Sequence, residues 1–146
     1  MKKIYNYLLC IVIFICSATL VKAQTDDAKR EKIEALRVAF ISKRANFTPA
    51  EAQAFWPLYN EMNDKQEAFR KAFKQKYNNA TNYNFENDKD AEAYLNAELT
   101  LKQKEYEIYK EYYEKFKKVL PVKKVAIIRR AEDDFKKEII KSIKEN

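Results

Sequence analysis

The chain contains no glycine and no histidine, and its only two cysteines lie in an apolar run near the N-terminus. An average protein has about 7% glycine. The absence of glycine excludes the loops that cradle nucleotides and most tight turns with positive φ. Without histidine or a further cysteine, the common nucleophile–base pairs and zinc sites cannot be built. We therefore expect a protein that is not an enzyme and that uses no cofactor and no nucleotide.

The first 23 residues have the pattern of a secretory signal peptide. Two lysines follow the first methionine, residues 8–20 form the apolar run, and Ala23 ends a small-residue cleavage site. A membrane anchor is the alternative, but the run is short for a span of about 20 residues. We expect cleavage after Ala23, export to the periplasm and a single mature domain of residues 24–146.

Charge of both signs is abundant. Removing the three lysines of the leader from 29 basic residues leaves 26 against 22 acidic ones, a net charge of +4. The two signs are mixed along the chain, which is typical of helices with ion pairs on their surfaces. A nucleic-acid-binding protein would concentrate its basic residues, so we expect no nucleic-acid partner.

The most informative segment begins at Phe47 and starts a helix. Thr48 and Glu51 have the spacing of a capping box, and Pro49 fits the first helical position. Phe47 stands just before the cap, where it can pack back onto the first turn. Pro57 lies inside the same helix, where it removes a backbone hydrogen bond and predicts a bend.

Hydrophobic periodicity predicts an all-α fold of four helices at about 25–45, 49–77, 89–120 and 122–143. The asparagine-rich break at 78–88 predicts a long antiparallel hairpin of the second and third helices. The predicted core faces of the first, second and fourth helices are Ile33, Leu36, Ala39 and Phe40; Phe55, Tyr59, Met62, Phe69, Phe73 and Tyr77; and Val125, Ile128, Ala131, Phe135, Ile139 and Ile143.

The third helix has two apolar stripes, more than one neighbour requires. The two stripes are Ala91, Leu95, Leu99, Tyr106, Tyr109, Tyr113, Phe116 and Leu120, and Tyr94, Leu101, Ile108, Tyr112 and Val119. Either the helix packs between two helices of its own chain, or one stripe faces a second subunit across a two-fold axis. Which stripe would make that contact stays open.

Three segments carry a resemblance to a known family. Residues 47–51 resemble the Leu-Thr-x-x-Gln motif of the Spy/CpxP-like periplasmic proteins, and the continuation to residue 61 resembles the branch identified as sensors of ECF-type sigma factors. Residues 116–126 resemble the second motif of that branch, and 131–136 resemble its last helix. The chain departs from the motif with Phe47 for Leu and Glu51 for Gln, and its second copy has Pro121 for Thr and Lys124 for Gln.

The resemblance implies a cradle-like homodimer and a role in envelope stress. One expected function is that of an ATP-independent chaperone for unfolded or partly folded envelope proteins. The alternative is a regulator that acts on a membrane stress sensor or a sigma-factor pathway. A third possible function is metal sensing, for which only carboxylates such as Glu132, Asp133 and Asp134 could serve as ligands. Three consecutive helix positions do not converge on one ion.

Several residues are candidates for partner contacts. Val38 and Ile41 lie off the predicted core face, so they either meet a partner or are scattered exposed apolar residues. Trp56 either packs at the edge of the core or offers an aromatic surface to clients. A basic cluster near the start of the last helix is either a solvated face or a rim that attracts acidic clients or an anionic membrane surface. This cluster consists of Lys123, Lys124, Arg129 and Arg130.

Overall fold

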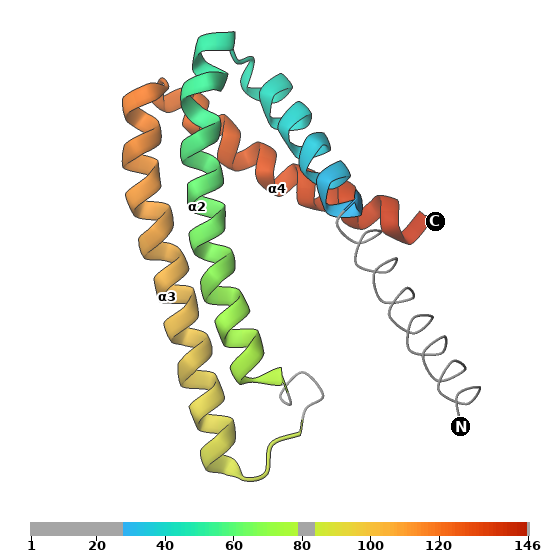
Figure 1. Cartoon of the computed structure of the whole chain (residues 1–146), viewed down its shortest axis with the longest axis vertical. Coiled ribbons are helices and arrows are strands. Elements are labelled where there is room, and N and C mark those ends of the chain that lie inside the picture. The colour runs from blue at the N-terminus through green and yellow to red at the C-terminus, as the bar shows by residue number, and fades with distance from the viewer. Residues whose placement is uncertain (1–27, 79–83, 146) are drawn as a thin grey trace, which may run out of the picture. The chain divides into compact units, whose positions relative to one another are not determined.

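The structure, a computed structural model, describes residues 28–78 and 84–145 and is all-α in this part of the chain (Figure 1). An N-terminal helix covers 28–45, and it is followed by α2 (Pro49–Lys76), α3 (Asp88–Val119) and α4 (Val122–Glu145). The predicted all-α class is confirmed. The predicted leader and its cleavage site lie outside the described residues. None of the described helices is both long and apolar enough to span a membrane.

The helix boundaries follow local signals. Thr48 is the N-cap of α2, with the predicted capping box and a proline in the first turn. Asn87 caps α3 by accepting a hydrogen bond from the backbone N–H of Asp90 at 3.0 Å. Asn46, directly after the N-terminal helix, has φ 47°, a left-handed conformation that asparagine tolerates and that often ends helices. α2 continues through the exposed Pro57, and the bend there stays a prediction.

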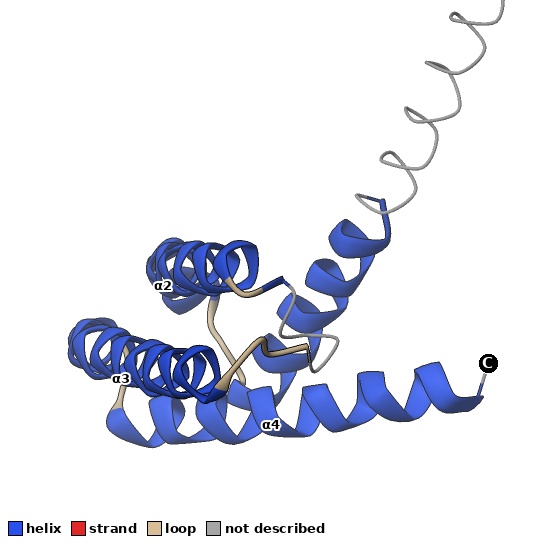
Figure 2. Ribbon diagram, turned by 90° about the horizontal axis from the view of Figure 1, so that it is seen from below, coloured by secondary structure: helices blue, strands red, loops and turns tan. Residues whose placement is uncertain are grey.

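α2 and α3 form the predicted antiparallel hairpin and lie side by side in both views (Figures 1 and 2). Arg70 pairs with Glu105, and the Tyr77 hydroxyl donates to the Ala93 carbonyl, so later residues of α2 meet earlier residues of α3. The buried side chains between them are Phe55, Tyr59, Met62 and Gln66 of α2 and Ile108, Tyr112 and Phe116 of α3. The ring centroids of Phe55 and Phe116 are 4.8 Å apart.

The chain divides into two compact units whose boundaries fall inside the N-terminal helix and α4. Residues 44–130 hold the hairpin and the start of α4, while 28–43 and 131–145 form the other unit. In the latter, the rings of Phe40 and Phe135 lie 5.7 Å apart, and the Arg37 guanidinium is 5.9 Å from the Phe135 ring. The single domain over 24–146 stays a prediction.

The predicted core face of the N-terminal helix is wrong. Ile33 and Leu36 are 36% and 48% exposed, whereas Ile41 is fully buried. Apolar residues occur around most of this helix, so periodicity alone does not identify the side that the rest of the protein covers. Ile41 is therefore a core residue and not an exposed contact, and Val38 is half-buried.

The core faces of the other helices also need correction. In α3, Leu95, Leu99 and Tyr106 are 56%, 65% and 66% exposed, so only the C-terminal end of the first stripe contributes to the core. The second stripe supplies the buried Ile108 and Tyr112 that face α2. Phe69 of α2 and Ile143 of α4 are exposed, while Val125, Ile128, Ala131 and Phe135 are buried as predicted.

Candidate functional site

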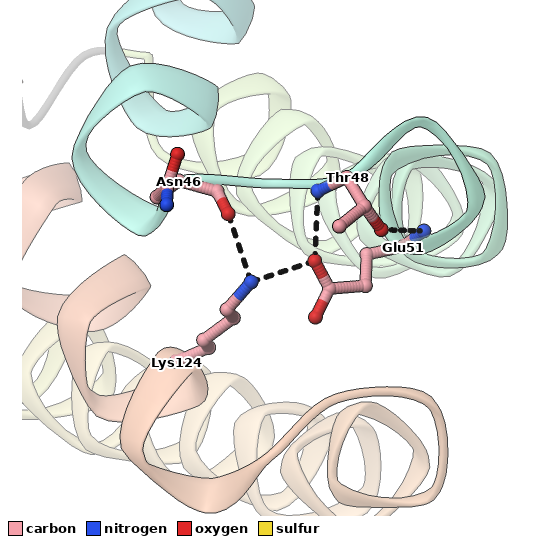
Figure 3. Close-up of polar contacts among 4 residues, drawn as sticks. All are labelled: Asn46, Thr48, Glu51 and Lys124. Carbon is pink, nitrogen blue, oxygen red and sulfur yellow. Dashed lines mark hydrogen bonds and ion pairs between the residues drawn. The ribbon is translucent and has the colours of Figure 1, made fainter.

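A network of hydrogen bonds connects the first turn of α4 with the first turn of α2 (Figure 3). The ammonium of Lys124 donates to Oε2 of Glu51 at 2.6 Å and to the carbonyl oxygen of Asn46 at 2.8 Å. The same Glu51 oxygen accepts from the backbone N–H of Thr48 at 2.8 Å, and the Thr48 hydroxyl accepts from the Glu51 N–H at 3.3 Å. One carboxylate thus serves both the helix cap and an ion pair between residues 73 positions apart.

The charges of this network stabilise each other. The side chains of Lys124 and Glu51 are only 23% and 20% exposed. The hydrogen bond from Lys124, followed by that from the Thr48 backbone, lowers the pKa of Glu51 below its usual value. Lys124 lies near the start of α4, where a cation opposes the helix dipole. Its contacts with Glu51 and Asn46 explain its position.

The predicted basic cluster is therefore not one binding surface. Lys124 belongs to the network around Glu51, and Arg129 and Arg130 have interactions of their own. Lys123 is exposed. At about 100° per residue, Lys123 and Arg130 fall on one face of the helix, whereas Lys124 and Arg129 lie about 100–120° to either side of it, so the four cations do not share one face.

Trp56 is half-buried in a group of aromatic side chains. Its ring packs edge-on against Phe55 and Tyr59, both at 5.2 Å, and against Phe47 at 6.2 Å. Phe47 also packs on Phe55 at 5.2 Å, as the position before the cap predicts. These contacts favour the edge-of-core interpretation of Trp56 over the client-contact interpretation.

Part of the predicted core stripe of α3 is exposed, and it is the main exposed apolar feature of the unit formed by residues 44–130, which we call the hairpin unit. We call Leu95, Leu99 and Tyr106 the α3 stripe. Ion pairs along α3 accompany it: Lys102 with Glu98 at 3.2 Å and Lys104 with Glu107 at 2.9 Å. The signal for this surface was present in the sequence as the surplus of apolar positions on the third helix.

A second group of charges covers the core at the middle of the hairpin. The ammonium groups of Lys115 and Lys65 lie 4.1 and 5.0 Å from the centre of the buried Tyr112 ring, within the range of cation–π contacts. Lys115 also pairs with Glu111 at 2.8 Å, and this hydrogen bond lowers the pKa of Glu111. The group shields apolar side chains from water.

Within 28–78 and 84–145, no three histidine, cysteine, aspartate or glutamate side chains are arranged to hold a metal ion. Glu132 is buried, and it and its two acidic neighbours have other interactions. Comparisons with models of protein families, with curated proteins and with solved structures find no match to this chain. The resemblance to the Spy/CpxP-like proteins stays a prediction.

Proposed function

We propose that the protein is an exported, ATP-independent chaperone that binds partly unfolded envelope proteins through the α3 stripe. The observation that carries the proposal is the exposure of Leu95, Leu99 and Tyr106 at 56%, 65% and 66% on one helix. Export rests on the signal-peptide pattern of the first 23 residues. A stripe of this kind suits extended apolar segments, which a folded protein does not display.

The size of the stripe supports weak and reversible binding. Burying a large apolar side chain completely contributes about 1.5–3 kcal/mol, so the exposed parts of three such side chains supply about 3–5 kcal/mol. That range corresponds to dissociation constants between about 6 mM and about 0.2 mM. Clients that also use the neighbouring charges bind more tightly and associate faster. Release then needs no energy from a nucleotide.

The test is suppression of aggregation of a reduced, unfolding client by residues 24–146. Wild type in several-fold molar excess should delay aggregation, and the variant Leu95→Gln with Leu99→Gln should have lost most of this effect. Val122→Gln is the matched control, because Val122 is 64% exposed but lies at the start of α4. Equal activity of the stripe variant and wild type would refute the assignment of the surface, and an inactive wild type would refute the function.

A second copy of the chain is the competing occupant of the α3 stripe. At about 100° per residue, Asp88 and Glu92 fall on the same face as Leu99, and so do Lys110 and Lys117 towards the other end. Two antiparallel copies would therefore bring opposite charges together. Light scattering distinguishes the two occupants. If wild type is a dimer and the Leu95→Gln, Leu99→Gln variant is a monomer, the stripe is the homodimer interface and clients must bind another surface.

The regulatory alternative uses a surface of the same kind. A sensor-binding protein would need one defined membrane partner, whereas a chaperone binds many misfolded ones. A pulldown from envelope extracts with purified residues 24–146, with the stripe variant as control, separates the two functions. Recovery of a single membrane protein by wild type alone would favour regulation.

A further inference from the structure

α4 continues well beyond the last residue that it contributes to the core. Phe135 is its last buried residue, and residues 136–145, which we call the C-terminal segment, have none. The segment nevertheless carries three isoleucines, of which Ile140 is 56% and Ile143 70% exposed. A short helix without tertiary packing is only marginally stable in water. Core packing therefore does not explain these apolar side chains.

The charges of the C-terminal segment are arranged around its isoleucines. At about 100° per residue, Lys136 falls on the isoleucine face, Lys137 and Lys144 lie about 100° from its centre on one side, and Lys141 lies about 150° from it. Glu138 and Glu145 fall nearly opposite that face. With Lys136, the segment has four lysines and two glutamates. Three of the four lysines thus lie nearer the apolar face than either glutamate.

The ion pairs that two of these lysines make are long and exposed. Lys137 is 3.9 Å from Asp134, and Lys141 is 3.8 Å from Glu145, both near the upper limit for an ion pair. Their side chains are 70% and 74% exposed. Such surface pairs contribute little to stability, so their loss would hardly oppose another contact.

We propose that the C-terminal segment binds the surface of membranes that contain anionic lipids. A helix with an apolar face and flanking lysines lies in the membrane interface, where the side chains enter the headgroup region and the ammonium groups meet phosphates. The position of the cations selects this occupant. A second copy docking on the same face would bury Lys136 of both copies in an apolar contact, which is unfavourable.

The other helix of this unit supports the proposal. Ile33 and Leu36 are exposed there, and Lys32 lies beside them. The α3 stripe differs in that the ion pairs beside it are shorter, Lys102 with Glu98 at 3.2 Å and Lys104 with Glu107 at 2.9 Å. The α3 stripe and the C-terminal segment therefore have different charge environments and suit different partners.

The test is co-sedimentation of residues 24–146 with lipid vesicles. We expect binding to vesicles of phosphatidylglycerol mixed with phosphatidylcholine, and none to phosphatidylcholine alone. A lysine close to an anionic surface contributes about fivefold to binding, so Lys136→Gln with Lys144→Gln should weaken it about 25-fold. Lys71→Gln with Lys74→Gln on α2 removes the same charge and should have little effect.

A second variant tests the apolar face. Ile140→Gln with Ile143→Gln should abolish vesicle binding while circular dichroism shows the helices retained. Absence of binding by wild type, equal binding to both vesicle types, or unchanged binding by the isoleucine variant would overturn the proposal. The proposal would also be overturned if wild type were a dimer and the isoleucine variant a monomer. The Leu95→Gln, Leu99→Gln variant should bind vesicles like wild type, so failure here is distinct from failure of the chaperone function.

Discussion

Removing the ammonium of Lys124 tests whether the network at the start of α2 stabilises the hairpin unit. Lys124→Met keeps the apolar stem of the side chain but leaves the Asn46 carbonyl without its charged donor. A hydrogen bond with a charged group contributes about 1.5–3 kcal/mol. Because the Lys124 side chain is 23% exposed and water can reach the exposed Asn46, we expect the variant to lose only about 1 kcal/mol of unfolding free energy. Loss of the ion pair acts in the same direction.

The pH dependence of this effect has a definite sign. Lys124 holds the pKa of Glu51 below its ordinary value of 4.5. Because the pKa is depressed in the folded state, the ion pair contributes stability above pH 4.5 and loses it as the pH falls through the folded pKa. The difference between wild type and Lys124→Met should therefore be constant near neutral pH and shrink in acid.

Urea unfolding followed by circular dichroism measures both effects. Lys104→Met is the matched control, because Lys104 also has a 2.9 Å ion pair but is 48% exposed and bonded within its own helix. We expect this control to change stability little. A Lys124→Met variant as stable as the control at neutral pH would refute the reasoning.

A double variant isolates the pairing itself. Lys124→Gln alone leaves the Glu51 carboxylate without its cation, whereas Glu51→Gln with Lys124→Gln replaces the ion pair by two neutral amides. We expect the double variant to be at least as stable as Lys124→Gln. If the double variant loses as much unfolding free energy as Glu51→Gln and Lys124→Gln together, the two residues act independently.

Two further predictions concern the hairpin. Thr48→Ala removes the hydroxyl that accepts from Glu51 and should lower the unfolding free energy by about 1 kcal/mol, whereas Thr48→Ser should retain stability; equal losses would exclude the cap as the cause. Gln66 is 1% exposed, and its Nε2 has no hydrogen-bond partner among the described residues. Gln66→Leu should therefore raise the unfolding free energy by about 1 kcal/mol in urea titrations, and a loss would indicate that the amide is satisfied by water.

The helices could be predicted because their signals are local. The spacing of Thr48 and Glu51, the proline after the cap and the break before Asp88 specify where helices begin without reference to the rest of the chain. The pairing of α2 with α3 follows from two long amphipathic helices joined by a short break. These features depend on residues within a few positions of one another.

The same local signals do not predict which face of each helix is buried in the core. Leu99 and Tyr112 belong to equally apolar stripes of α3, yet Leu99 is 65% exposed and Tyr112 is fully buried. Periodicity identifies both stripes, but the choice between them depends on how α2 packs. Ile41 and Leu36 differ in the same way on the N-terminal helix. The partner of Lys124 is 73 positions away, so no local pattern indicates it.

The network connects two residues at which the chain departs from the Leu-Thr-x-x-Gln pattern that its sequence is predicted to resemble. In that prediction, Glu51 and Lys124 occupy the positions where glutamines would stand in the first and second copies, and the two side chains meet at 2.6 Å. Either charge alone would be costly in a site that is only about one-fifth exposed, whereas the pair neutralises itself and satisfies the Asn46 carbonyl. The two departures therefore compensate each other within the architecture. Because the motif residues are engaged in starting and joining helices, we place partner contacts on the α3 stripe and the C-terminal segment, which the motif does not include.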